Sequence, residues 1–438
     1  MNTAIPPQIS HQNNQLSQEA NLDLAQQQAI SVVESLRAGI PTRLSTRQLP
    51  DLRPELTRLI EQDLAQLEAG HHPRGRLIWG SYGQGKTHAL TALEHLALDR
   101  GFAVSRVALS REVSCHQLFN FYGRVAPLIR LPDSASGLAA LLSRKSPQGI
   151  QSSIMDRLDR YQHPLPAFVL ENLLYASGED QDLLYGDLVG SRLTLTDLRR
   201  IHRANRDGVM PRFERTFKVS EDGAAYFGVM ADALKTFGYK GWVLLIDEVE
   251  LIGRLGKVSR LKAYRNLQWL LNWSSLQPNS FPLYTIGVVA SGLRTDLWYR
   301  GTTNTRTLSD SVAIPDLALE KLGSQEIAQE MKTFFTQAID PHCPVLKPLL
   351  PQAQKTLLTE IITLHGIAFG WDPSLDLDLL AQQLGDKPVR TYIRATLESL
   401  DMAYLYQESW QVATTELQEA SLVEDEAYFR LEDPDGLS

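Results

Sequence analysis

The chain has 438 residues, of which 43% are hydrophobic and 21% charged, which is ordinary for a globular protein of two or three domains. Its formal net charge of −8 is not typical of a protein that binds nucleic acid over its whole surface. The two cysteines, Cys115 and Cys343, lack a metal-site spacing and fit a reducing compartment. No long apolar run predicts a membrane span and no secretory leader pattern opens the chain, so we expect a cytoplasmic protein.

The N-terminal segment, residues 1–24, is rich in Gln, Asn and Ser and is predicted to be disordered. Apolar residues at helical spacing begin at Leu24 and stop near Pro41, and a second helix is expected over residues 54–69. These helices lead into the first part of an α/β core, so we assign residues 25–130 to one segment.

A glycine-rich stretch lies between a short apolar strand, residues 76–79, and a helix, residues 89–98. It reads Gly80-Ser81-Tyr82-Gly83-Gln84-Gly85-Lys86-Thr87-His88 and contains the P-loop pattern Gly-x-x-x-x-Gly-Lys-Thr. The glycines let the backbone approach phosphates closely, and the N-terminus of the following helix favours an anion. The stretch therefore predicts an ATP-binding loop in which Lys86 contacts the β- and γ-phosphates and Thr87 binds Mg²⁺.

A second strand is predicted over residues 102–109, and strand, loop, helix and strand in this order begin a parallel α/β sheet. Residues 131–235 show no clear strand pattern and are predicted to form a helical insertion. The insertion carries a basic cluster made of Arg192, Arg199, Arg200, His202, Arg203, Arg206, Arg212 and Arg215. Such a cluster is typical of a solvated helix face, and it also fits contact with nucleic-acid phosphates or an acidic partner.

An apolar run, residues 242–246, ends in Asp247 and Glu248. It predicts a buried parallel strand with carboxylates at its C-terminal end, where ligands bind in open α/β sheets. Asp247 would hold Mg²⁺, directly or through water, and Glu248 would act as the general base that polarises the attacking water. Together with the P-loop, this pair predicts an ATP-hydrolysing site.

The second part of the core is assigned to residues 236–322 and includes a strand over residues 283–290 that ends at Ser291. Ser291 would point at the γ-phosphate or the attacking water, or it would cap the next turn as an ordinary strand-end serine. A short strand is also expected over residues 312–314. Residues 323–410 are predicted to form a helical lid, and residues 411–438 an acidic tail.

These motifs resemble an AAA+ ATPase of the origin-recognition and signalling type. In that class, Ser291 would be the first γ-phosphate sensor, and Gly385-Asp-Lys-Pro-Val-Arg390 resembles the lid motif in which the arginine, Arg390, is the second sensor. The resemblance also makes Arg294, Arg300 and Arg306 candidates for an arginine finger acting on a neighbouring subunit, although a surface arginine is the commoner interpretation of each. Arg306 is favoured because it precedes the expected strand.

Four stretches, residues 35–41, 80–88, 237–250 and 264–267, also resemble the BrxD family of ATP-binding proteins from BREX phage-defence systems. The resemblance implies a P-loop NTPase fold, ATP and Mg²⁺ as cofactors, and a homo-oligomer. It further implies a switch or motor that works on DNA or with DNA-acting partners such as a helicase. The alternative is a signalling or assembly scaffold that hydrolyses ATP slowly. A GTPase is disfavoured because the chain lacks a base-reading Asn-Lys-x-Asp element.

Overall fold

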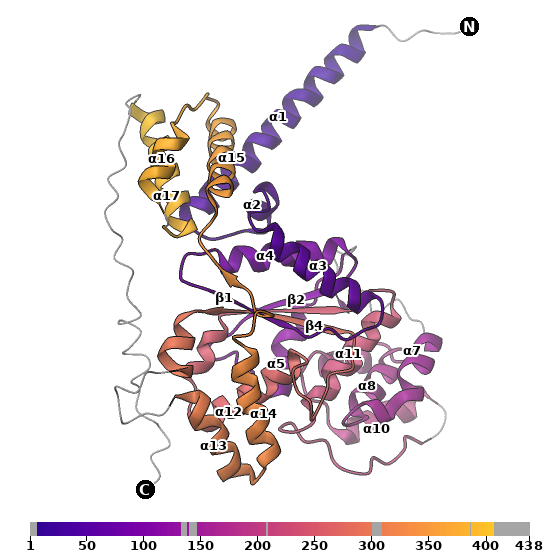
Figure 1. The fold of residues 1–438 in the computed structure, drawn as a ribbon. Coiled ribbons are helices and arrows are strands. Elements are labelled where there is room, and N and C mark those ends of the chain that lie inside the picture. Colours follow the sequence, from indigo (N-terminus) through magenta and orange to yellow (C-terminus); the bar gives the residue numbers. More distant parts are fainter. Residues whose placement is uncertain are drawn as a thin grey trace, which may run out of the picture. The chain divides into compact units, whose positions relative to one another are not determined.

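A computed structural model describes residues 7–132, 138–139, 147–206, 209–299, 309–385 and 387–406. The chain divides into two compact units, which are described separately (Figure 1). The smaller unit contains the described residues of 1–54, 82–92 and 346–420, and the larger unit those of 55–81 and 93–345. None of the described helices is long and apolar enough to span a bilayer.

The larger unit is organised around a mixed α/β core with a five-stranded sheet of order β2-β3-β4-β1-β5. The strands are β1 (Arg76–Gly80), β2 (Ala103–Ala108), β3 (Trp242–Asp247), β4 (Leu283–Ala290) and β5 (Val345–Leu346). The β2–β3, β3–β4 and β4–β1 pairs are all parallel, so the predicted parallel sheet is confirmed. Because β4 lies between β1 and β3, the residue that follows β4 lies at the same sheet edge as the ends of both neighbours.

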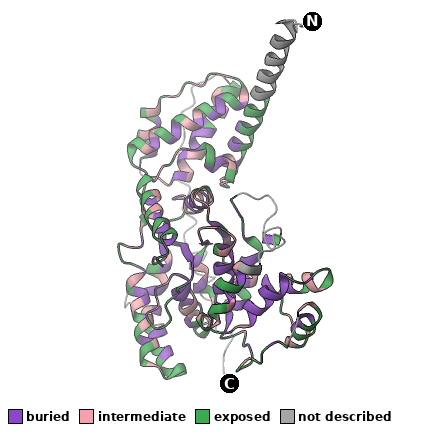
Figure 2. Cartoon of the chain, turned by 90° about the vertical axis from the view of Figure 1, so that its right-hand side faces the viewer, coloured by how far each residue is buried: buried purple, intermediate pink, exposed green. Residues whose placement is uncertain are grey.

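Helices cover both faces of this sheet. In Figure 1, α3 (Pro54–Glu68) lies on one face, and α5 (Leu118–Val125), α11 (Gly223–Thr236) and α12 (Lys257–Leu270) lie on the other. Helix α11 is apolar on nearly every side and buried along most of its length, as expected of a helix in the middle of a domain. Figure 2 shows buried residues concentrated in the strands and in the helices packed on them.

The remaining elements of the larger unit are mostly helical. Between β2 and β3 these are η1 (Ala126–Leu128), α7 (Pro147–Ser153), η2 (Met155–Arg160), α8 (Leu165–Leu173), α9 (Glu179–Leu188) and α10 (Leu195–Asn205). After β3 come η3 (Val249–Arg254), η4 (Arg294–Trp298), α13 (Asp310–Leu322) and α14 (Gln325–Gln337). Between β2 and β3, the described regular elements are thus helices joined by loops, apart from a β-bridge between Val104 and Arg130.

The smaller unit joins the two ends of the chain. It contains α1 (Pro7–Ala38), α2 (Arg43–Gln48), α15 (Pro351–Phe369), α16 (Leu377–Leu384) and α17 (Val389–Tyr406), together with the loop and first turns of α4 (Lys86–Asp99). In its hydrophobic core, Val33 and Leu36 of α1 pack in one cluster with Leu357 and Ile361 of α15 and Leu400 of α17.

Two sequence expectations differ from the structure. Helix α1 begins at Pro7, inside the segment predicted to be disordered; no Gly or Pro interrupts the sequence between Pro7 and Ala38, so nothing breaks the helix. The strand expected over residues 312–314 is wrong, because these residues lie in α13. The β-branched Val312 and Ile314 suggested a strand, but Ile314 and Ala318, one turn apart, share the buried face of a helix. The predicted acidic tail lies outside the described residues.

Candidate functional site

The phosphate loop begins in the larger unit, where β1 ends at Gly80. The carbonyl of Gly80 accepts a hydrogen bond from the N–H of Ser291, with an N···O distance of 3.3 Å. Ser291 follows β4 directly, and β4 pairs with β1 up to Gly80 and Ala290. The structure therefore brings Ser291 next to the first glycine of the loop.

The two predicted carboxylates lie at the end of β3 in the same unit. Asp247 is the last residue of that strand and is buried, and its Oδ1 accepts a hydrogen bond of 3.0 Å from the N–H of Glu248. Glu248 is exposed and has φ 56° and ψ 41°, in the left-handed region that residues with a side chain seldom adopt. Such strained backbone clusters at functional sites, where the surrounding structure holds it in place.

Glu250 holds this turn on the neighbouring strand. Its Oε2 accepts a hydrogen bond of 3.0 Å from the N–H of Ala290, the residue before Ser291. The turn also packs closely on β4, because a Cβ added at Gly287 would lie 3.1 Å from Cγ2 of Val249. Glu250 thus fixes the turn that begins at Glu248 relative to the end of β4. We did not single out Glu250 from the sequence, although it is the third acidic residue of the run Asp-Glu-Val-Glu.

Two arginines place positive charge among the carboxylates of this edge. Arg106 on β2 lies with Nη2 3.4 Å from Oδ2 of Asp247 and with Nη1 3.8 Å from Oε2 of Glu94. Arg130 lies with Nη1 2.9 Å from Oε1 of Glu94, whose side chain is buried on α4. No sequence motif marks Glu94, Arg106 or Arg130, so only the arrangement of the strands brings them together with Asp247.

The rest of the phosphate loop, from Tyr82, belongs to the smaller unit. Gly83 and Gly85 have φ values of +75° and +83°, which glycine adopts without strain. Helix α4 begins at Lys86, so the N–H groups of its first turn and the positive end of the helix dipole follow the two glycines directly. A glycine-rich turn that opens a helix in this way is suited to bind an anion.

Residues far away in the sequence contact this part of the loop. Arg53 donates a hydrogen bond of 3.2 Å from Nη2 to the carbonyl of Gln84, and burial lowers the pKa of Arg53. The N–H of Arg390 donates to the carbonyl of Gly83 at 3.2 Å, and its Nη1 donates to the hydroxyl of Tyr82 at 2.6 Å. Arg390, predicted to be a γ-phosphate sensor, therefore lies directly against the loop. Arg53 was missed, since no motif surrounds it.

The remaining predicted residues are placed only in part. His88, on the first turn of α4, lies with Nδ1 3.4 Å from Oγ1 of Thr46. Arg294 is exposed, and its N–H donates to the carbonyl of Ser291 at 3.1 Å. Arg300 and Arg306 lie outside the described residues. The described part of the chain contains no group of three or more His, Cys, Asp or Glu side chains able to hold a metal ion.

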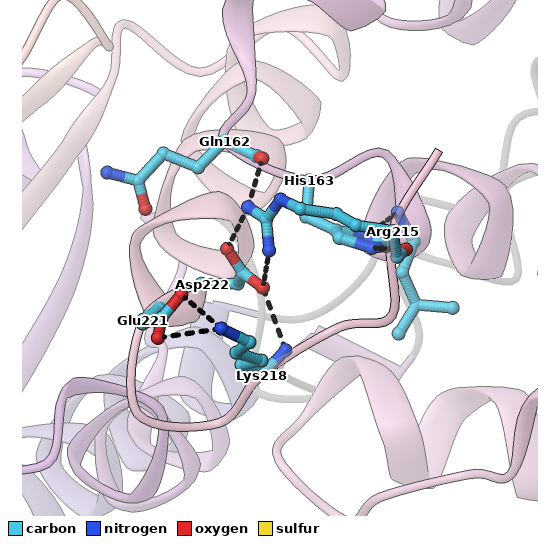
Figure 3. A network of polar contacts seen from close by, with 7 residues as sticks. Gln162, His163, Arg215, Lys218, Glu221 and Asp222 are labelled. Carbon is cyan, nitrogen blue, oxygen red and sulfur yellow. Dashed lines mark hydrogen bonds and ion pairs between the residues drawn. The ribbon is translucent and has the colours of Figure 1, made fainter. Parts of the chain in front are cut away.

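The basic cluster of the insertion, apart from exposed Arg192, separates into two sets. Four members have partners inside the fold: Arg200 with Asp180, Arg206 with Glu171 and Tyr175, Arg215 with Asp222, and buried His202 with Asn172. Figure 3 shows the Arg215 network, in which both ends of the guanidinium contact the Asp222 carboxylate and Nη2 also donates to the carbonyl of Gln162 at 2.9 Å. The Arg215 side chain thus joins two segments of the insertion.

The second set is exposed. Arg199 and Arg203 are one helical turn apart on α10, with Leu198 and Ile201 buried on its opposite side. Arg212 is exposed on the segment that follows. No ion pair joins these three arginines to another described residue, so their charges face solvent.

Comparisons with known proteins bear on the nucleotide-binding interpretation. No curated protein matches the chain. The model of the family of BREX system ATP-binding proteins BrxC/D matches residues 24–155 and 218–288, which contain the phosphate loop, Asp247 and Glu248. The resemblance to the BREX ATP-binding family expected from the sequence is confirmed, and the match supports an ATP-binding protein of BREX phage defence.

Proposed function

We propose that this chain is a Mg²⁺-dependent ATPase of the AAA+ type that acts as a nucleotide-driven switch or motor in BREX defence. The observation that carries the proposal is the strand-loop-helix from β1 to α4, in which Gly83 and Gly85 take left-handed backbone conformations directly before Lys86. The family match supports ATP as the nucleotide.

Binding of the phosphates is assigned to the loop from Gly80 to His88. Its N–H groups and the first turn of α4 would face the phosphate oxygens, and Lys86 would pair with the β- and γ-phosphates. Mg²⁺ would be held by the Thr87 hydroxyl and by the Asp247 carboxylate, the oxygen ligands that this ion prefers. These residues fit the ion: Thr87 opens α4, and Asp247 carries a carboxylate at a strand end, where its Oδ2 lies 3.4 Å from Nη2 of Arg106. When bound, the ion would neutralise charge that develops on the phosphates.

Hydrolysis is assigned to Glu248, Ser291 and two arginines. Glu248 would accept a proton from the attacking water, and Ser291, beside Gly80, would hold the water or the γ-phosphate through its hydroxyl. Arg390 would donate N–H groups to the γ-phosphate from the lid. Arg306 would act on the nucleotide of a neighbouring subunit in a homo-oligomer.

Two substitutions separate binding from hydrolysis. Lys86→Ala should weaken ATP binding by about 10- to 100-fold, since a hydrogen bond to a charged group contributes about 1.5–3 kcal/mol. Glu248→Gln should leave ATP affinity unchanged and lower kcat by about 10²- to 10⁴-fold, because it removes the base alone. Fluorescent-nucleotide titration and phosphate release with and without Mg²⁺ measure both.

Glu221→Gln provides the matched control for the second change, because Glu221 is exposed and pairs with Lys218 away from the loop. It should keep full turnover. ATP turnover that survived both Lys86→Ala and Glu248→Gln would contradict the site assignment. ATP-dependent assembly without steady turnover would favour the scaffold alternative.

We further propose that the exposed arginines of the insertion contact DNA phosphates. Arg199, Arg203 and Arg212 are the members of the basic cluster whose charge is not used inside the fold. Arg199→Ala with Arg203→Ala should weaken binding to a DNA duplex at low salt and reduce the salt dependence of log K by about 1–2, one unit for each lost phosphate contact. Arg200→Ala on the same helix is the control, because Arg200 pairs with Asp180. Equal loss in both proteins would contradict a specific role of the exposed pair.

A further inference from the structure

Tyr82 is an exposed aromatic residue of the phosphate loop, and two specific contacts join it to Arg390. Tyr82 is 77% exposed, and the guanidinium carbon of Arg390 lies 5.6 Å from its ring centroid. Nη1 of the same guanidinium donates to the Tyr82 hydroxyl at 2.6 Å. A cation over an aromatic face and a charge-assisted hydrogen bond therefore act on Arg390 together.

The backbone around Arg390 is fixed as well. Its N–H donates to the carbonyl of Gly83 at 3.2 Å, and its Nη2 donates to the carbonyl of Gly39 at 3.2 Å. Pro388, two residues earlier, lies so close to Gly83 that a Cβ added there would come within 2.9 Å of the Pro388 Cβ. The start of α17 is thus seated on the loop, and the guanidinium is held at two of its nitrogens.

These contacts leave part of the guanidinium able to bind an anion. A guanidinium carries five N–H donors in a rigid plane, and the two contacts described use one on each terminal nitrogen. An arginine already oriented before an anion arrives loses less side-chain entropy on binding it. Tyr82 and the Gly39 carbonyl therefore set the direction in which the remaining N–H groups point.

We propose that Tyr82 is a positioning residue that makes the site prefer ATP to ADP by orienting Arg390 toward the γ-phosphate. The inference rests on the proposed ATPase function. It adds a role that the P-loop pattern does not contain, because the pattern leaves the residue at position 82 unspecified. Arg390 supplies the contact with the phosphate, and Tyr82 acts through Arg390.

The glycine at position 39 belongs to the same arrangement. A Cβ built there would lie 2.7 Å from both Nε and Nη2 of Arg390. Even the smallest side chain would therefore displace the guanidinium from its place over Tyr82. This gives a second, independent way to disturb Arg390 without changing the loop.

The experiment compares Kd for ATP and for ADP in the full chain with Mg²⁺. Tyr82→Phe keeps the ring and removes the hydroxyl, and it should lower the ATP-over-ADP preference by about two- to fivefold; Tyr82→Ala, which also removes the cation–π contact, should lower it further. ADP affinity should change less than twofold. Arg390→Ala should remove the preference, and adding Tyr82→Phe to Arg390→Ala should have no further effect, because Tyr82 acts only through Arg390.

Gly39→Ala should also lower the preference, and Gly370→Ala is its matched control. Gly370 ends α15 with φ +67°, close to the φ +69° of Gly39, but a Cβ there would contact nothing within 4 Å. Equal effects of Tyr82→Phe on ATP and ADP, tighter ATP binding, or an effect that persists in Arg390→Ala would each overturn the proposal. These outcomes differ from failure of the ATPase function itself, in which Lys86→Ala would leave nucleotide binding intact.

Discussion

In the larger unit, the charged groups at the two edges of the sheet where strands begin and end differ in how deeply they are buried. At the edge where β1 and β4 begin, Arg76 and Asp63 are both about 7% exposed and joined by two hydrogen bonds, one of them 2.9 Å long. Asp63 also accepts from the hydroxyl of buried Tyr284, and Arg76 donates from Nη1 to the carbonyl of His342 at 2.7 Å. Each buried charge at this edge has a close partner, as burial in a low-dielectric interior demands.

His342 closes the same network in its neutral form. Its Nε2 lies 3.1 Å from the carbonyl of Gly75, which requires a proton on Nε2, and its Nδ1 accepts from Nη1 of Arg76 at 3.2 Å. Burial and then the charge of Arg76 lower the pKa of His342. A second proton on this ring would face the arginine, so the network excludes it.

The opposite edge, where β1, β3 and β4 end, is more exposed. Arg106 is 22% exposed and lies 3.4 Å from Asp247 and 3.8 Å from Glu94, and Glu248 is exposed. An exposed carboxylate can bind an ion or a water molecule more readily than a buried one. The comparison indicates that the first edge stabilises the fold, whereas the second is the edge at which ligands bind in open α/β sheets and at which the proposed site lies.

The largest effect on stability is expected from breaking the closed network. Asp63→Ala leaves Arg76 buried without its carboxylate and should destabilise the larger unit by about 3–5 kcal/mol. Urea unfolding followed by tryptophan fluorescence measures the loss, and ATP affinity at low temperature should not change. Replacing both partners, with Arg76→Met and Asp63→Leu, should recover most of the stability, since no charge then remains unpaired.

Glu221→Ala is the control for this prediction. Glu221 and Lys218 form an ion pair in which both side chains are more than half exposed, so its loss should cost less than about 1 kcal/mol. Similar losses in Asp63→Ala and Glu221→Ala would break the distinction between a closed structural network and ordinary surface charge.

The sequence predicted the elements that local patterns specify. Runs of apolar residues located four strands, and the strand of residues 283–290 has the predicted bounds, because such runs fit a sheet buried on both faces. Glycine spacing predicted the turn between β1 and α4, in which Gly83 and Gly85 have positive φ values that favour glycine. The strand prediction failed at residues 312–314, because it relied on two β-branched residues and not on the helical spacing of apolar residues in the longer segment.

Contacts between distant segments could not be predicted in this way. Tyr82 and Arg390 are 308 positions apart, and Arg106 reaches Asp247 only because β2 pairs with β3. Neither the cation–π contact nor the Arg106 contact leaves a periodic pattern in the sequence. The basic cluster was visible as a group, but only the fold separates Arg215, bound to Asp222, from the exposed Arg199 and Arg203.

A smaller effect, on activity rather than stability, should distinguish the more exposed edge. In the proposed site, Arg106 and Mg²⁺ compete for the Asp247 carboxylate. Arg106→Gln should therefore lower the Mg²⁺ concentration for half-maximal ATP turnover by up to about fivefold, which corresponds to the energy of a partly exposed ion pair. Stability should change by less than about 1 kcal/mol. Arg130→Gln is the control, because Arg130 pairs with Glu94. If both variants shifted the Mg²⁺ midpoint equally, the general loss of positive charge at this edge would explain the effect; if neither did, Arg106 would belong with Arg76 among the structural charges.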